Sequence, residues 1–450
     1  MRLLPLILAA TLASCTTDIA PSPTATRADT LMRELAGRDR FQGAVVIQRG
    51  ARVEYAAGFG FADIERRVPF TPDTPMDGGS IAKPFTAAAL LMLAHERRID
   101  LDAPVRTLLP AYPHDTTRVR HLLAHSAGLP DYGWFDPPRS PPDTVRSNAS
   151  HLALLAHAAL PPAFAPGTAY RYDNLAYDTA ALLIEKASGQ SWQEVIAQRF
   201  LGPLAMTSTF VRPARFADWR GAPRTRGYRR TAEGWQDHDA HDFEGFHGAA
   251  NLYVSARDLA RFMHGYRQVV GADVLRSATT PARLDDSRAT GMTLGCWYAA
   301  DEGRRRYYTG SHNGFYTFGY ADDERGLAVA WVSNDSMPGW LRHRLARALI
   351  AVVEGREAEP IGEPPAAAAV VADPAGRYRV PGIGSVVIRA DGPRLFVTAQ
   401  GVEYEAFAVG RSLRYVPGLD AFVRFAATPE GGVSLSWDSV FVAPTPSMRQ

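Results

Sequence analysis

Two pairs of alternating hydrophobic segments predict β-hairpins. In the first pair, residues 43–48 and 51–55 carry Val, Ile and Tyr and are separated by Arg49-Gly50, where the glycine permits a tight turn. In the second pair, residues 314–320 and 327–333 flank the polar run Ala-Asp-Asp-Glu-Arg-Gly. Because strands joined by such short connections run antiparallel, both pairs predict antiparallel sheet structure.

Helical patterns dominate the stretch between the hairpins. A segment rich in Ala, Leu and Met predicts a helix from Ser80 to about Arg98, and residues 85–265 alternate helical segments with loops marked by Pro and Gly. Residues 342–354 have an amphipathic pattern that predicts a closing helix. We therefore expect an α/β (α+β) domain over residues 31–354, with an antiparallel sheet flanked by helices and a helical subdomain.

The pattern changes again near the C-terminus. Residues 355–373 are rich in Pro, Ala and Glu and predict a linker. From 374 to 450 the chain shows short alternating segments, such as 394–398 and 434–438, separated by turns that contain glycine. These features predict a small all-β domain.

The N-terminus has the pattern of a secretory leader. Arg2 precedes an apolar run that is too short to span a membrane, and the sequence Leu-Ala-Ser-Cys ending at Cys15 resembles the lipobox of bacterial lipoproteins. Residues 1–14 are then a signal peptide, and residues 15–30 are a lipidated tether. Since Thr16 rather than Asp follows the cysteine, we expect a cell-envelope lipoprotein on the periplasmic face of the outer membrane. The alternative is an ordinary cleaved secretory peptide.

The composition argues against a nucleic-acid partner and draws attention to one lysine. The 450 residues carry a net charge of only +2, which gives no basic field for nucleic acid. Of the 49 Lys and Arg residues only Lys83 and Lys186 are lysines. Arg cannot act as a base in a protein, whereas Lys can, so Lys83 calls for a chemical explanation. Apart from Cys15 the chain holds only Cys296, which we interpret as a small buried hydrophobe.

Ser80-Ile81-Ala82-Lys83 opens the predicted helix. A separation of three residues places Ser80 and Lys83 on one helical face, so the amine can reach the hydroxyl. The positive end of the helix dipole and burial both favour a neutral amine, which is the form that can accept the proton of a serine nucleophile. Taken alone, the spacing also fits a helix-capping serine with an incidental lysine.

Two further motifs follow in order. Ser-x-x-Lys, a second polar triad and Lys-Thr-Gly mark β-lactamases and penicillin-binding proteins. Here Tyr172-Asp173-Asn174 resembles the Tyr-x-Asn element of class C β-lactamases and their esterase and peptidase relatives, and His312-Asn313-Gly314 is assigned to the third motif. The chain therefore resembles this serine hydrolase family over residues 32–352.

The resemblance implies a β-lactamase/transpeptidase-like fold and acyl transfer to Ser80 followed by hydrolysis. Lys83 would take the proton of Ser80, Tyr172 would assist attack and leaving-group protonation, and Asn174 would orient the amine or a substrate amide. The backbone N–H groups of Ser80 and of Phe315, on an edge strand, would form the oxyanion hole. The chemistry needs no cofactor or metal. We expect a monomer acting on a small-molecule or peptide substrate, with a C-terminal domain similar to the lipocalin-like appendages of relatives.

His312 departs from the family pattern, which has Lys at this motif. A neutral imidazole at pH 7 holds a carboxylate less well than an ammonium does, so we expect esters, amides or D-amino-acid peptides to be preferred over β-lactams. Two other functions stay open. In the first alternative, the protein is a penicillin-binding or sensing protein that is acylated with little turnover. In the second, the β domain serves as the main ligand-binding module.

Residues 237–247 form a polar cluster with three histidines and four carboxylates. Such a run can bind zinc or calcium, but its spacing matches no compact ligand pattern. We interpret it as a polar loop near the cleft.

Overall fold

The computed structural model describes residues 22–130, 145–221, 224–239, 244–361, 371, 373–409, 412–428, 431–442 and 445–450. Its helices are α1 (Pro23–Gly37), α2 (Ala82–His95), α3 (Val119–Leu123), α4 (Asn148–Ala158), α5 (Asn174–Ser188), α6 (Trp192–Ile196), α7 (Ala256–Thr279) and α8 (Gly339–Val353). Within these ranges, every helix is too short or too polar to cross a membrane.

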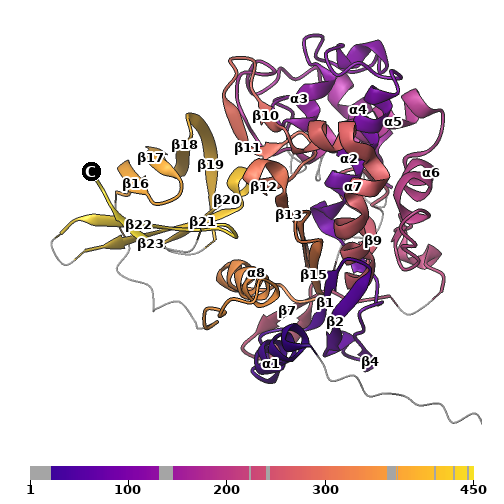
Figure 1. Cartoon of the computed structure of the whole chain (residues 1–450). Coiled ribbons are helices and arrows are strands. Elements are labelled where there is room, and N and C mark those ends of the chain that lie inside the picture. The colour runs from indigo at the N-terminus through magenta and orange to yellow at the C-terminus, as the bar shows by residue number, and fades with distance from the viewer. Residues whose placement is uncertain are drawn as a thin grey trace, which may run out of the picture.

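A six-stranded antiparallel sheet forms the centre of the hydrolase part, in the order β12-β13-β14-β15-β1-β2. Its strands are β1 (Gly43–Arg49), β2 (Arg52–Phe59), β12 (Tyr298–Ala300), β13 (Arg305–His312), β14 (Phe315–Asp322) and β15 (Leu327–Ser333). Both predicted hairpins are confirmed, since β1 pairs with β2 and β14 with β15. Every residue of β14 and β15 is buried, because α7 covers one face of the sheet and α8 the other (Figure 1).

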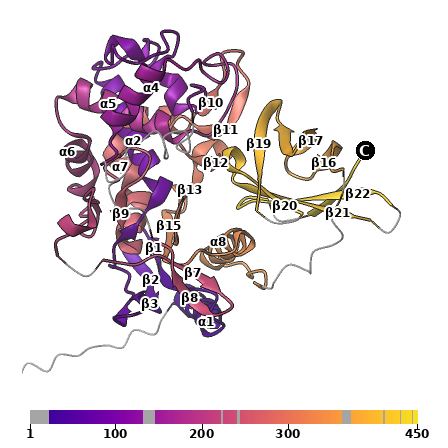
Figure 2. The same cartoon turned by 180° about the vertical axis from the view of Figure 1, so that it is seen from behind.

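The remaining strands of this part are short. They are β3 (Phe61–Asp63), β4 (Val68–Pro69), β5 (Met76–Asp77), β6 (Phe210–Val211), β7 (Tyr228–Thr231), β8 (Gly234–Asp237), β9 (Leu252–Val254), β10 (Pro281–Arg283) and β11 (Ala289–Thr293). Helix α2 packs against α7 on the sheet side and against α5 of the helical subdomain (Figure 2). Helix α2 therefore lies at the junction between the sheet and the helical subdomain.

The folded part of the chain begins earlier than the sequence analysis expected, with helix α1. Residues 23–30 were assigned to the tether, but they belong to this helix. Ser22 caps it by accepting a hydrogen bond from the N–H of Ala25, and Pro23 occupies the first turn, where a missing N–H costs little. Ala25 and Ala28 are buried, so burial of one helical face stabilises the segment. Residues 1–21, including Cys15, lie outside the described residues.

The predicted all-β C-terminal region is confirmed. Eight strands pair in sequence order: β16 (Gly376–Val380), β17 (Gly384–Asp391), β18 (Arg394–Ala399), β19 (Val402–Ala408), β20 (Leu413–Val416), β21 (Ala421–Ala427), β22 (Val433–Asp438) and β23 (Thr445–Met448). A bridge between Tyr378 and Arg449 joins the first strand to the end of the last. This sequential, closing arrangement is that of an up-and-down β-barrel. Residues 362–370 of the predicted linker lie outside the described residues.

Alternate positions of the barrel strands are buried, with Val386, Leu395, Val397, Val423 and Trp437 at most 7% exposed. Side chains therefore fill the interior, as is usual for a barrel of this size.

Helix α8 joins the barrel to the hydrolase part through charged contacts. His343 Nε2 lies 3.1 Å from Asp420 Oδ2, and Arg347 Nη1 donates to Asp438 Oδ1 at 2.6 Å. Burial alone would lower the pKa of His343, but the carboxylates of Asp420 and Asp438 raise it to about 9. The contact is therefore an ion pair at neutral pH. On the other side of the interface Tyr298 Oη donates to the carbonyl of Pro417.

Candidate active site

Ser80 lies in the short 3-10 turn η1 (Gly79–Ile81) that leads into α2. Gly79 has φ +53°, a left-handed conformation that favours glycine. The turn is held from below by Asp77, whose Oδ1 accepts the N–H of Gly79 at 2.8 Å. The Ser80 side chain is thus presented at the N-terminal end of α2.

Lys83 is fully buried and its amine reaches three acceptors. Nζ lies 3.0 Å from Ser80 Oγ, 2.7 Å from Asn174 Oδ1 and 3.2 Å from the carbonyl oxygen of Ala249. A neutral amine has two N–H donors and one lone pair. In that form the two donors would satisfy Asn174 and Ala249, and the lone pair would be left for the hydroxyl of Ser80.

Tyr172 also contacts Ser80. Its Oη lies 2.8 Å from Ser80 Oγ, and its ring stacks on His125 at a centroid distance of 4.6 Å. His125 Nδ1 accepts the N–H of Asp173 at 3.1 Å, which fixes the ring next to the turn that carries Tyr172. Burial, and then the electrostatic effect of the neighbouring Lys83 side chain, hold the pKa of His125 well below its usual range, so this ring is a neutral support. The sequence analysis did not select His125.

Strand β13 lies directly beside the Ser80 turn. A Cβ atom on Gly310 would overlap the carbonyl oxygen of Gly78, and one on Gly79 would lie 2.8 Å from the backbone nitrogen of Ser311. Only glycines allow the two backbones to approach so closely. The residues of β13 that border the nucleophile are therefore Gly310 and Ser311.

The assignment of Phe315 to the oxyanion hole is wrong. Phe315 begins β14, which is an interior strand of the sheet and not an edge. It pairs with His312 across the two-residue turn Asn313-Gly314, and the pair that closes such a turn shares hydrogen bonds within the hairpin. In the next pair along the ladder, Ser311 faces Tyr316 without such bonds, so the Ser311 N–H points away from β14 towards the Ser80 turn.

The third motif is displaced from its assigned position. Gly310 is the glycine that the close approach requires, so Lys-Thr-Gly corresponds to Tyr308-Thr309-Gly310 rather than to His312-Asn313-Gly314. Tyr308 Oη lies 3.5 Å from Tyr172 Oη, which places a phenol where the family motif has an ammonium. Burial raises the pKa of Tyr308 well above its usual range, so the phenol stays neutral. Asn313 and Gly314 form the hairpin tip, where Gly314 packs against the backbone of Gly227 and Tyr228.

His312 lies on the same face of β13 as Tyr308, four residue pairs further along, and contacts Asp77. Its Nδ1 is 2.9 Å from Asp77 Oδ2. Burial alone would lower the pKa of His312, but the carboxylate of Asp77 raises it to about 9. The expectation of a neutral imidazole at this residue is therefore wrong. Its charge is balanced by a buried carboxylate that the sequence analysis did not select.

The polar cluster at 237–247 is divided among several partners. Asp237 pairs with Arg226, Glu244 Oε1 accepts from Arg146 at 2.8 Å, and His247 Nε2 lies 3.1 Å from Glu185 Oε1. In the described part of the chain, His, Cys, Asp and Glu side chains form no group of three or more that could hold a metal ion. Residues 240–243 lie outside that part. Glu244 Oε2 is 4.0 Å from His312 Nε2, so one end of the cluster does border the site.

Cys296 is fully buried behind the site, where burial raises its pKa to about 11. A thiol in this state is an inert packing group.

Comparisons with known proteins identify the family of the chain. The family model described as Beta-lactamase matches residues 28–354. Penicillin-binding protein 4* of Bacillus subtilis (strain 168) is 26% identical over 328 residues, which are 68% of this chain and 70% of that protein. The octameric penicillin-binding protein homologue from Pyrococcus abyssi has a TM-score of 0.62 at 22% identity, covering 94% of this chain and 99% of that one.

A third relative is a D-amino acid amidase from Ochrobactrum anthropi SV3, with a TM-score of 0.55 at 20% identity over 70% of this chain and 92% of that one. The family model spans most of the chain, and Ser80, Lys83 and Tyr172 come together within it. The chain therefore belongs to the beta-lactamase family of serine hydrolases and penicillin-binding proteins.

Proposed function

We propose that the protein is a hydrolase that works through an acyl-enzyme on Ser80. The observation that carries this proposal is the position of Ser80 Oγ, 3.0 Å from Lys83 Nζ and 2.8 Å from Tyr172 Oη. A hydroxyl between an amine and a phenol can lose its proton to one and receive help from the other during departure of the leaving group.

In acylation Ser80 Oγ attacks the substrate carbonyl carbon while its proton passes to Lys83 Nζ. The bond to the leaving group then breaks, and the departing oxygen or nitrogen takes a proton from Tyr172 Oη. The proton on Lys83 then passes to the phenolate of Tyr172, whose ring centroid lies 4.9 Å from Lys83 Nζ, so that both groups regain their starting state. Water hydrolyses the acyl-enzyme by the same steps in reverse. Two backbone donors, the N–H groups of Ser80 and Ser311, stabilise the oxyanion in each half.

We propose esters, amides and D-amino-acid peptides as substrates, with β-lactams hydrolysed less well. Tyr308 supports this choice, because a neutral phenol replaces the third-motif cation that would hold a substrate carboxylate. His312 is charged, but its pairing with Asp77 offsets that charge. The relation to a D-amino acid amidase is consistent with an amide or ester substrate.

The test uses a fluorophosphonate probe and a fluorescent penicillin on the wild type and Ser80→Ala. We expect labelling and ester hydrolysis by the wild type, and loss of both in a variant with an unchanged circular dichroism spectrum. Labelling of Ser80→Ala at the wild-type level contradicts the proposal. Stoichiometric labelling without turnover of any ester, amide or cephalosporin instead identifies a penicillin-binding or sensing protein.

A further inference from the structure

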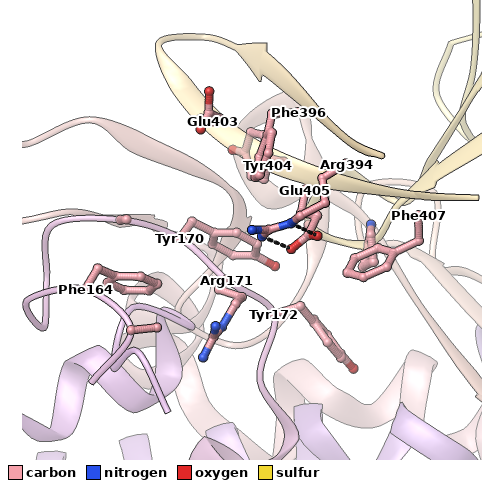
Figure 3. A pocket seen from close by; sticks show the side chains of 14 residues that line it. Phe164, Tyr170, Arg171, Tyr172, Arg394, Phe396, Glu403, Tyr404, Glu405 and Phe407 are labelled. Carbon is pink, nitrogen blue, oxygen red and sulfur yellow. Dashed lines mark hydrogen bonds and ion pairs between the residues drawn. The ribbon is translucent and has the colours of Figure 1, made fainter. Parts of the chain in front are cut away.

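A cavity of about 320 Å³ opens beside Tyr172 and has walls from both parts of the molecule (Figure 3). One wall is the segment that leads to α5, with Phe164, Tyr170 and Tyr172. The other wall is formed by β18 and β19 of the barrel, with Phe396 and Phe407. Tyr172 lines this cavity and also contacts Ser80 through its hydroxyl, so the cavity borders the catalytic site.

The barrel wall offers apolar surface to solvent. Phe407 is 50% exposed, one of few large hydrophobic side chains in the described residues to be so. Phe396 lies under the guanidinium groups of Arg389 and Arg394, whose carbon atoms are 4.1 and 4.8 Å from its ring centroid. An exposed aromatic at the mouth of a concave site is typical of ligand contact.

The charges on this wall are already paired. Arg394 makes two hydrogen bonds to Glu405, at 2.8 and 2.9 Å, and Arg389 makes two to Glu403, at 2.9 and 2.7 Å. Both guanidinium groups of the barrel wall are thus matched by carboxylates, while Arg171 of the opposite wall donates to the carbonyl of Leu129 and lies 5.9 Å from the ring centroid of Phe164. The cavity therefore presents aromatic rings and guanidinium planes, on which an aromatic group can stack.

The two walls are fixed relative to each other. The rings of Tyr170 and Tyr404 pack at a centroid distance of 5.1 Å, and Gly418 lies so close to Tyr170 that a Cβ there would overlap its ring. Arg288 Nη1 also donates to the carbonyl of Gly401 at 2.7 Å. The barrel thus holds β18 and β19 against the segment that carries Tyr170 and Tyr172.

We propose that this cavity binds the leaving group of the substrate, and that it selects an aromatic or bulky apolar alcohol or amine. The inference rests on the proposed function, in which Tyr172 Oη protonates the departing atom. The leaving group then departs on the Tyr172 side of Ser80, and Tyr172 is also a wall of the cavity. The barrel is on this view a specificity element of the hydrolase.

The experiment compares 2-phenylethyl acetate with ethyl acetate, which share an acyl group and have similar leaving-group basicity. We expect kcat/KM for the aromatic ester to be roughly ten- to hundredfold higher, as burial of one phenyl group allows. Phe407→Ala and Phe396→Ala should each lower this ratio several-fold, and Phe407→Asp should lower it further. Met448→Ala is the matched control, since Met448 is 53% exposed on β23 outside the cavity.

A second pair of esters varies the acyl group and keeps the leaving group constant, so that effects on the two parts of the substrate can be told apart. Ethyl 3-phenylpropionate and ethyl acetate share a leaving group, so the Phe407 and Phe396 variants should leave their ratio unmoved. A ratio near one in the leaving-group series, or an effect of these variants on the acyl series alone, overturns the inference while Ser80-dependent hydrolysis stands. If no ester is hydrolysed in a Ser80-dependent way, the proposed function itself has failed.

Discussion

Lys83 and Lys186 are the only two lysines of the chain, and they provide a matched pair for testing the base. Lys83→Arg should reduce kcat/KM for a nitrophenyl ester about as much as Lys83→Ala, by roughly 10³-fold or more, because Arg keeps the charge but cannot accept the proton of Ser80. The exposed Lys186→Arg serves as the control and should retain full activity. Turnover near the wild-type level in Lys83→Arg would show that another group is the base.

We expect Tyr308 to determine how strongly the site binds a substrate carboxylate. In Tyr308→Lys we expect the ratio of penicillin to ester kcat/KM to rise roughly ten- to hundredfold, because an ammonium adds a charge-assisted hydrogen bond to a substrate carboxylate. His312→Lys should change the ratio less, since that side chain is directed at Asp77. The idea fails if the two lysine variants behave alike or if Tyr308→Lys leaves the ratio where it was.

The close approach of β13 to the Ser80 turn positions the oxyanion donors. At Gly310 this approach leaves no room for a side chain. Gly310→Ala should lower kcat at least 100-fold, because its Cβ would overlap the carbonyl oxygen of Gly78 and push the strand away from the turn. Gly37→Ala, where no atom lies within 4 Å of a new Cβ, is the control. Steady-state kinetics together with thermal melts separate misplacement from unfolding. Wild-type kcat in Gly310→Ala would contradict the role given to β13.

The same strand shows what sequence reasoning can and cannot reach. Ser80 and Lys83 are three residues apart in one helix, so their contact follows from local geometry. The third motif depends on strand register against a turn some 230 residues away, which one sequence does not reveal. Tyr308, Gly310 and His312 lie on one face of β13, because side chains alternate along a strand. His312 therefore resembled the first residue of the motif although it lies four residues beyond Tyr308. The signal that was missed is Thr309-Gly310, which matches the Thr-Gly of the family motif.

At the scale of the whole molecule, the ion pair of His343 with Asp420 makes the stability of the interface between barrel and hydrolase depend on pH. Its folded pKa of about 9 exceeds the ordinary 6.5, so its stabilisation is full below pH 6.5 and is lost as pH rises through 9. The amount is at most about 3 kcal/mol. Asp420→Asn should therefore melt well below the wild type at pH 6 and close to it at pH 10.

Thermal melts of both proteins from pH 6 to 10 measure this difference, and comparison with the wild type cancels the similar titration of His312. If the difference in melting temperature between Asp420→Asn and the wild type stays constant across this range, His343 does not titrate as described.

We propose that the intact chain is a monomer anchored through a lipid on Cys15. Cells fed labelled palmitate should yield a labelled protein that osmotic shock does not release, because several acyl chains hold a protein stably where one is marginal. Cys15→Ser should lose the label and appear in the soluble periplasmic fraction or remain unprocessed. Complete release of unlabelled wild type would indicate an ordinary secretory leader.

The burial of Lys83 has a practical consequence for labelling and immobilisation. Amine-reactive reagents need an accessible side chain, and Lys83 is fully buried whereas Lys186, near the end of α5, is exposed. Once the α-amine is blocked, a succinimidyl dye or an activated bead should couple at Lys186 alone. The protein thus carries a single-site conjugation handle without engineering, and it can be displayed in one orientation while Ser80 remains free to react.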